Sequence, residues 1–580
     1  MMYMFSNKNE KHNIYEICIL TVILVVLAFD AFFVSRKEGY HMDEILSYEL
    51  SNSEFTPWIT PTQPQGRLEK YYLEHIYDKN IAVRIANLFD QISDIMKNRG
   101  SSAALQMTAD VYDTPVWMSR DDVISYVTYD KDDSVPVLSP YYNTTTDNHP
   151  PLYFILLNAF SMIHDKVFPG VLSPWTGCIL NMIFMALSLL MIILIFADIF
   201  EKKYTGLFAT LFYGLSTAGL STVLLIRMYS MTAFFCLAYT YLLLKKLKEG
   251  SDFKKKNKLL ILVTVLGFLT QYFVCIYYFF LTLSVMVYLG VLKEKKKLLY
   301  ILRMLLISSA WGLGLYPFVF HDLLGTQVGE SVMGSFGASS GYFEKLTAFF
   351  RIISGEILGS SFGFMIVILL GAGLLIYSVK KKTVNIYALF MCISAVAYLF
   401  LVSRIAPYLV DRYVMPIFPI AILCLVFIVQ EVVITISERY IAKDRERKVF
   451  YFALLSLLSV FCLLLGVFHN PGYLYSGYDV QRDISERYSS LDAVVIYEGT
   501  SFYQNVPELM NYQNALLLKE DELSAEYDRL RGVDELIVII GTGVDEKKVF
   551  GSFGSKYGFS SITVLLENGA FGDTVCLLRK

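Results

Sequence analysis

Two short stretches of the sequence bring acidic and imidazole side chains together beside apolar segments. They read "GYHMDEILSYEL" at 39–50 and "YYNTTTDNHPPLYF" at 141–154. A positioned carboxylate can take a proton as a general base, and carboxylates with imidazole can also hold a divalent cation. The side chains that could do this chemistry are His41, Asp43, Glu44, Asp147 and His149.

Two further stretches supply arginine and tyrosine, "LLIRMYS" at 224–230 and "SRIAPYLVDRYVMPIFP" at 403–419. The planar fork of an arginine can bind two phosphate oxygens at once. Taken singly, each stretch is also typical of a polar helix end, a snorkelling arginine or a salt-bridged loop. All four stretches are predicted below to lie on one side of one membrane, and this favours a common site that includes Arg227, Tyr229, Arg404, Arg412 and Tyr413.

The composition indicates which kind of scaffold must position these residues. The chain has 580 residues, of which 55% are hydrophobic and 18% charged, and its mean hydropathy is +0.48. Such a chain is too apolar for a soluble protein and too long for a single anchor, so it is predicted to be a polytopic membrane protein. The net charge of −3 gives no reason to expect a nucleic-acid partner.

Apolar runs long enough to cross a bilayer recur along the chain. The first of them is too long for a signal-peptide core and lacks a small-residue cleavage site, so it is interpreted as a retained span. About eleven transmembrane helices are predicted, at 14–34, 176–199, 204–224, 229–245, 257–270, 273–291, 299–319, 361–379, 386–404, 412–432 and 448–468.

Lysine and arginine collect in every second connection between these spans, and short basic loops stay in the cytoplasm. The basic clusters are at 201–203, 245–258, 293–297, 380–382 and 438–448. We therefore expect a multi-pass protein of the cell membrane with a cytoplasmic N-terminus at 1–13. The extracytoplasmic parts are then 35–175, 225–228, 271–273, 320–360, 404–412 and 469–580.

The apolar segment 150–164 does not fit as a further span. It has fifteen residues, whereas about 20 are needed to cross, and crossing would move every later basic cluster outside. It is predicted to be an outward-facing interfacial or re-entrant helix that begins at Pro150 and Pro151, because proline suits a helix's first turn. The large first external loop at 35–175 is also predicted to contain a helical stretch at 66–98.

The tail from 469 to 580 has a different composition. Short β-rich runs, "LDAVVIYEG", "NALLLKE", "DELIVIIGT" and "SITVLLE", alternate with helix-like segments at 520–531 and 545–557. The predicted fold is therefore a polytopic α-helical membrane protein with a large first external loop and a small C-terminal α/β domain.

The motifs resemble those of the GT-C membrane glycosyltransferases. "HMDE" follows the first span, "DNHPPLYF" closes the long first external loop, "RMYS" lies between the third and fourth spans, and "DRYVMPIFP" lies near the last ones. Within the superfamily the chain is most similar to bacterial relatives of the protein O-mannosyltransferases and of the lipid A aminoarabinose transferase. The resemblance covers about 14–468, and a C-terminal outer domain is common in such proteins.

This resemblance implies transfer of a sugar from a polyprenyl-phosphate-linked donor to an acceptor hydroxyl on the outer face, with inversion at the anomeric carbon. By the same resemblance the first-loop acid is the general base, which corresponds to Asp43 with Glu44 beside it. The leaving lipid phosphate is an anion, so the arginines and tyrosines listed above are candidates to bind it. Further candidates for binding substrate or metal are His41, Asp147, His149, Tyr153, Gln271 and Tyr272; Gln271 stands where relatives often have histidine.

Other classes remain open on the sequence alone. An O-antigen ligase or polymerase also uses lipid-linked glycans, but should lack the acidic pair after the first span. A transporter or flippase would also have many spans, with internal repeats and polar breaks at the bilayer midplane. The sugar, the envelope acceptor and any requirement for a divalent cation are not determined by the residues.

Overall fold

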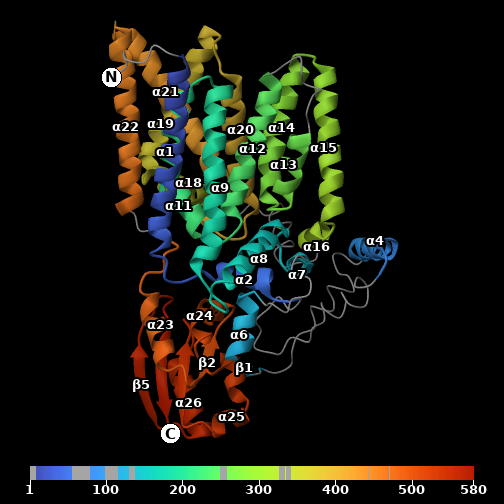
Figure 1. Ribbon diagram of the computed structural model, residues 1–580, viewed down its shortest axis with the longest axis vertical. Helices are drawn as coiled ribbons and strands as arrows, with labels where there is room; N and C mark the ends of the chain where they lie inside the picture. Colours follow the sequence, from blue (N-terminus) through green and yellow to red (C-terminus); the bar gives the residue numbers. More distant parts are fainter. Residues whose placement is uncertain are drawn as a thin grey trace.

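The computed structural model describes residues 8–54, 79–97, 115, 117–129, 138–248, 258–324, 334, 341–441, 443–468 and 471–580. Long helices run along the long axis of the molecule, and a sheet domain lies at one end of this bundle (Figure 1). The N-terminus lies at the opposite end. We call the end next to the sheet domain the sheet-domain end.

The bundle is built from apolar helices, because a helix satisfies its own backbone hydrogen bonds where lipid offers no partner. Its elements are α1 (Lys8–Val34), α9 (Pro174–Leu194), η2 (Ile195–Ile199), α10 (Lys203–Gly214), α11 (Thr217–Leu224), α12 (Tyr229–Lys248), α13 (Lys258–Phe268), α14 (Phe273–Val291), α15 (Lys295–Leu315), α18 (Tyr342–Leu358), α19 (Ser361–Lys381), α20 (Ile386–Ile405), η5 (Met415–Ile417), α21 (Phe418–Tyr440) and α22 (Asp444–Phe468).

Within the described residues, seven helices are long and apolar enough to cross a membrane, and eight if the bent pair α10 and α11 counts as one span. The chain is therefore a multi-pass membrane protein. The predicted span at 204–224 is in fact broken, with a bend of 58° between its two halves. The predicted span at 257–270 is the short helix α13, which has only 11 residues.

Short helices of the loop that follows α1 lie between the bundle and the sheet domain (Figure 1). Helix α8 has 14 residues, too few to span a bilayer. The proline pair precedes α8 instead of forming its first turn, and the Leu152 amide donates to the carbonyl of Leu269 at 3.0 Å. The predicted helix at 66–98 is observed only from Ile81, and 66–78 lie outside the described residues. The elements near this end are α2 (Met42–Asn52), α4 (Ile81–Lys97), α6 (Arg120–Val127), α7 (Leu138–Asn143), η1 (Thr144–Thr146), α8 (Leu152–Asp165) and α16 (Val319–Leu324).

The sheet domain contains one mixed sheet with strand order β1-β3-β2-β4-β6-β5. The central strands β3, β2 and β4 are parallel, whereas β1, β6 and β5 each pair antiparallel. Four strands match the predicted β-rich runs, while β1 and β6 were not predicted, and the helix predicted at 520–531 is two short pieces. The elements are β1 (Met118–Ser119), α23 (Tyr478–Arg487), β2 (Asp492–Tyr497), η6 (Ser501–Asn505), α24 (Val506–Leu509), β3 (Asn514–Lys519), η7 (Glu520–Ser524), α25 (Asp528–Arg531), β4 (Glu535–Ile540), α26 (Glu546–Tyr557), β5 (Ser561–Leu566) and β6 (Thr574–Arg579).

Alternate residues of the central strands pack on opposite faces of the sheet. On one face, Val494 and Ile496 pack with Val549 and Phe553 of α26. On the other face, Ala493, Val495 and Tyr497 belong to the same buried cluster as the core of the helical bundle. The sheet domain is therefore joined to the membrane part by a continuous apolar core.

Candidate functional site

Helix α2 presents Asp43 at the sheet-domain end, immediately after the first bundle helix. His41 is its N-cap, and His41 Nδ1 accepts a hydrogen bond from the Asp43 amide at 3.1 Å. Glu44 completes the capping box by accepting the His41 amide at 2.6 Å. These two bonds satisfy amides that a helix start leaves without partners, so they fix the backbone from which Asp43 projects.

His41 is a neutral hydrogen-bond acceptor in this arrangement. Burial is the main cause of the lowering of its pKa to about 4, and Glu44 opposes this shift. The neighbouring cations that add to the lowering are Arg412, Arg227 and Lys37. Although His41 Nδ1 lies 3.5 Å from the Asp43 carboxylate, the uncharged ring does not form an ion pair with it at neutral pH.

Glu44 is fully buried and both of its carboxylate oxygens are occupied. Oε2 accepts Lys37 Nζ at 2.9 Å, in addition to the His41 amide. Oε1 accepts the backbone amide of Ile226 at 2.7 Å. Glu44 thus ties the start of α2 to the segment between α11 and α12, and its oxygens are engaged by the fold.

Two guanidinium groups approach the Asp43 carboxylate from different elements. Arg412, in the short helix η4 (Asp411–Tyr413), contacts Oδ2 directly through Nη1. Arg227, between α11 and α12, places Nη2 4.0 Å from Oδ1. The Asp43 and Arg412 side chains retain 13% and 19% of their exposure, so a ligand can reach them. We call His41, Asp43, Arg227 and Arg412 the Asp43 cluster.

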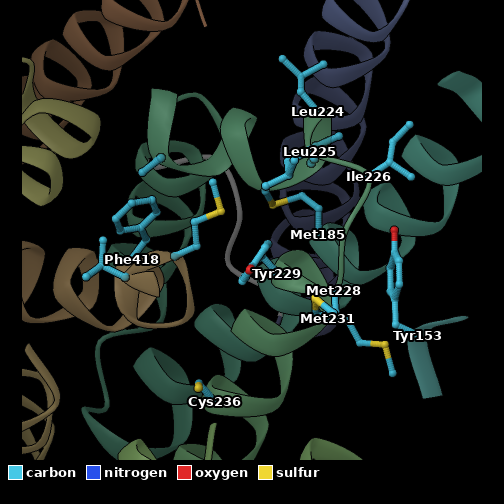
Figure 2. Packing of buried hydrophobic residues seen from close by; sticks show 14 of the residues in the cluster. Tyr153, Met185, Leu224, Leu225, Ile226, Met228, Tyr229, Met231, Cys236 and Phe418 are labelled. Atoms are coloured by element: carbon cyan, nitrogen blue, oxygen red, sulfur yellow. The ribbon is translucent and has the colours of Figure 1, made fainter. Parts of the chain in front are cut away.

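Arg227 does not snorkel to solvent, since only 5% of its side chain is exposed. Its Nη1 donates to Ser47 Oγ at 3.3 Å, and its guanidinium lies 5.8 Å from the ring centroid of Phe154. Figure 2 shows the packed apolar side chains on both sides of it in the chain, from Leu224 to Met231. Gly177 permits this packing, because a Cβ there would come within 2.1 Å of an Ile226 methyl.

Asp147 and His149 form a second polar pair at the same end. The Asp147 carboxylate lies 2.9 Å from His149 Nδ1. Burial by itself would raise the pKa of Asp147, but the His149 ring and the positive charge of Arg227 outweigh it and hold that pKa well below its usual range. The pair is therefore electrostatically linked to the Asp43 cluster through Arg227.

These residues do not assemble into a metal centre. Across the part of the chain that the structure describes, no group of three or more His, Cys, Asp or Glu side chains could hold a metal ion. Asp43 is engaged by arginine and Glu44 by Lys37, whereas Asp147 and His149 contact each other. The acidic and imidazole side chains are thus divided among separate interactions.

Three predicted substrate-binding residues make contacts only with other parts of the fold among the described residues. Tyr153 is fully buried and its hydroxyl donates to Asn181 Oδ1 at 3.3 Å. Gln271 is buried and accepts the Phe273 amide at 3.2 Å. The hydroxyl of Tyr272 donates to Asp322. Their observed contacts are structural.

The remaining predicted phosphate ligands differ in position. Tyr229 is buried among the apolar side chains in Figure 2. Tyr413 lies next to Arg412, and its ring centroid is 5.3 Å from that of Phe273. The guanidinium of Arg404 lies 5.7 Å from the ring centroid of Tyr342. Of the two arginines predicted for the 403–419 stretch, only Arg412 is observed against Asp43.

Two residues at this end were missed from the sequence: Lys37 and Tyr473. Lys37 lies three residues beyond the end of α1, at the predicted outer face, where the positive-inside rule does not account for a lysine. This unusual position of Lys37 was the feature of the sequence that could have identified it. Tyr473 falls in the predicted outer tail, and no sequence pattern links it to the cluster.

Neither a protein-family model nor a curated protein matches this sequence. Among solved structures, the fold is similar to two crystal structures of ArnT from Cupriavidus metallidurans, one bound to undecaprenyl phosphate and one in the apo state. The first has 10% sequence identity and a TM-score of 0.45, covering 74% of this chain and 88% of that chain. The second has 11% identity and a TM-score of 0.42, covering 74% and 87%.

Proposed function

We propose that the chain is an integral membrane glycosyltransferase that moves a sugar from a polyprenyl-phosphate-linked donor to an acceptor hydroxyl on the outer face of the membrane. The observation that carries the proposal is the carboxylate of Asp43 held between Arg412 and Arg227 at one end of the bundle. A base beside two phosphate-binding groups suits displacement of an anionic phosphate. The motifs "HMDE" and "DRYVMPIFP" support the same reaction class through their resemblance to GT-C enzymes.

An apolar cavity supports a lipid-linked donor over a soluble nucleotide sugar. The cavity has a volume of about 420 Å³ and lies among α18, α19, α20 and α21, with Phe350, Phe364 and Leu399 in its wall. Ile417 also lines it and follows Arg412 by five residues through the consecutive short helices η4 and η5. We propose that the isoprenoid chain of the donor lies in this cavity with its phosphate headgroup directed toward Arg412.

The reaction is a single displacement. The acceptor oxygen forms a bond to the anomeric carbon while the bond from that carbon to the phosphate oxygen breaks, which inverts the configuration. The bonding electron pair leaves with the polyprenyl phosphate, whose charge Arg412 and Arg227 neutralise. The hydroxyl proton passes to Asp43, which donor phosphate frees by competing for Arg412.

Glu44 and Lys37 act in this scheme as positioning residues. Their buried ion pair fixes the start of α2 and, through the Ile226 amide, the segment that carries Arg227. Asp147, which interacts electrostatically with Arg227, and its partner His149 are proposed to orient the donor sugar or the acceptor. Asp43, Glu44, Asp147 and His149 could bind a divalent cation only after their present contacts with other side chains were broken.

Donor binding is tested with purified full-length protein in lipid nanodiscs. We expect undecaprenyl phosphate to bind and undecaprenol, which lacks the phosphate, to bind much more weakly. Arg412→Gln should weaken undecaprenyl phosphate binding by about 10- to 100-fold, the loss expected for a charged hydrogen-bonded pair. Arg404→Gln is the matched comparison, because that guanidinium packs on Tyr342. Equal affinity for both lipids, or equal losses in both variants, would argue against the proposed donor site.

A flippase is the second candidate, favoured by the broken helix formed by α10 and α11. The two candidates separate in one assay. Proteoliposomes that contain the protein and a radiolabelled undecaprenyl-phosphate sugar are mixed with envelope extract as the source of acceptor. A transferase is expected to produce a radiolabelled, glycosylated acceptor. Movement of the lipid between leaflets without sugar transfer would instead identify a flippase.

A further inference from the structure

The connection from the bundle to the sheet domain lies directly against the start of the candidate site. We call residues 471–478 the stem. The Glu38 amide donates to the carbonyl of Leu474 at 2.9 Å, and the Gly477 amide donates to the Glu38 carboxylate at 2.5 Å. The stem is thus held to the three residues that precede His41.

Close packing keeps the stem in this place. A Cβ added at Gly39 would come within 2.9 Å of Tyr475 Cβ and 3.1 Å of Tyr478 Cγ. Contacts this short require glycine at position 39. The rings of Tyr473 and His41 are nearly perpendicular, at 79°, with 6.5 Å between their centroids.

Tyr473 makes polar contacts with both halves of the site. Its hydroxyl donates to Asp411 Oδ1 at 2.7 Å. Its carbonyl accepts a hydrogen bond from Lys37 Nζ at 2.6 Å, and the same ammonium binds Glu44. Tyr473 therefore bridges the turn that carries Arg412 and the helix start that carries Asp43.

The turn that carries Arg412 needs such external support. It is a 3-10 helix of three residues, Asp411–Tyr413, without a side-chain cap at its N-terminus. So short a 3-10 turn has poor hydrogen-bond geometry and little stability of its own. Asp411 immediately precedes Arg412, so a contact that fixes Asp411 also fixes the direction in which the guanidinium leaves the backbone.

We infer that Tyr473 is a positioning residue for the donor site, and that its hydroxyl orients Arg412 by holding Asp411. The sheet domain is then a working part of the transferase, because its stem supplies one of the contacts that align the phosphate-binding arginine with Asp43. This inference rests on the proposed function, since it assigns Arg412 to the donor phosphate.

Tyr473→Phe is the decisive variant because it removes only the hydroxyl and keeps the ring and the backbone carbonyl. Tyr478→Phe is the matched control, since it removes a hydroxyl from the same stem that donates to the Gln504 carbonyl within the sheet domain. With full-length protein in nanodiscs and undecaprenyl phosphate as the probe, we expect about tenfold weaker binding for Tyr473→Phe and unchanged binding for Tyr478→Phe. Melting temperatures of both variants should match that of the wild type.

A double-mutant cycle separates positioning from general loosening. Asp411→Ala removes the acceptor of the same hydrogen bond, so it should weaken binding to a similar extent. The double variant Tyr473→Phe/Asp411→Ala should have about the same affinity as whichever single variant binds more weakly. The reason is that both substitutions remove the same hydrogen bond. Independent, additive losses would overturn the inference.

The other outcomes are also distinct. Wild-type affinity in Tyr473→Phe overturns the positioning role while the proposed function stands. Failure of the wild type itself to prefer undecaprenyl phosphate over undecaprenol defeats the proposed function, and the inference falls with it. Failure of both single variants to fold would contradict the inference, because it assigns this hydroxyl to orientation and not to stability.

Discussion

Asp43 and Glu44 are adjacent in sequence, yet their surroundings differ in a way that separates their roles. Asp43 remains partly exposed between two arginines, whereas Glu44 is fully buried against Lys37. Removing one charge from a buried pair typically costs ~3–5 kcal/mol, because the other charge is left unpaired. The two carboxylates are therefore expected to respond differently to the same neutral substitution.

Asp43→Asn should fold normally and bind undecaprenyl phosphate, but sugar transfer should fall by about 10²- to 10⁴-fold, the usual contribution of a general base. Glu44→Gln should instead lower the melting temperature. The measurement is kcat at saturating donor, with circular-dichroism melting on the same samples. Near-normal kcat in Asp43→Asn would place the base elsewhere, with Asp147 as the next candidate.

Sequence reasoning located the residues of the Asp43 cluster but not their connections. Asp43, Arg227 and Arg412 are recognisable because charged residues next to apolar spans stand out. The choice between Arg412 and Arg404 depends on the turn at 411–413 and on the ring of Tyr342, which no local pattern encodes. Lys37 and Tyr473 meet across more than 430 residues of sequence, and a contact of that separation leaves no periodic signal.

At the level of elements, apolar periodicity predicted the bundle helices well, and the misses have physical causes. Strand β1 has two residues and exists only because it pairs with β3, far along the chain. The break between α10 and α11 lies within a continuous apolar run, where hydropathy alone cannot reveal a 58° bend.

Two buried carboxylates in the sheet domain, Glu508 and Asp573, make a pH-dependent contribution to stability. Gln481 Nε2 and Asn505 Nδ2 each donate to both Glu508 and Asp573, and these bonds hold the two buried carboxylates side by side. Burial, with the adjacent Asp573, raises the pKa of Glu508 to about 8 from its ordinary 4.5. Burial also raises the pKa of Asp573.

The folded chain therefore keeps a proton on Glu508 that the unfolded chain releases above pH 4.5. The contribution of Glu508 to the free energy of unfolding should be greatest below about pH 4.5. It should decrease as the pH rises to about 8 and change little above that pH. Glu508→Gln mimics the protonated acid, so the wild-type melting temperature should fall relative to the variant between pH 5 and pH 8. Titration of His41 is common to both chains and cancels in the difference. Parallel melting curves across this range would contradict the assignment.

At the scale of the whole molecule, the arrangement separates the ends of the chain. The sheet domain, the Asp43 cluster and the stem lie at one end of the bundle, and the N-terminus lies at the other (Figure 1). The predicted orientation, with basic loops in the cytoplasm, would place the candidate site outside the cell. That orientation can be tested without knowing the reaction.

Cysteines introduced one at a time at exposed positions, in a background that lacks the exposed Cys275 (Cys275→Ser), report the orientation. Lys203→Cys and Lys381→Cys should resist a membrane-impermeant thiol reagent in intact cells and react after lysis. Glu526→Cys and Lys547→Cys in the sheet domain should react in intact cells. Reaction of the first pair and protection of the second would reverse the orientation and remove the candidate site from the outer face.

The pairing of β1 with β3, together with the bond from Lys37 to Tyr473, has a consequence for biosynthesis. The loop between α1 and α9 emerges from the ribosome early, but the strand partner of β1 and the stem follow the last bundle helix, α22, in the sequence. The loop therefore lacks its partners in β3 and the stem while all the later helices are inserted. A nascent chain stalled before the stem should contain every apolar helix of the bundle and yet lack donor binding, so donor binding requires synthesis of the stem and the sheet domain.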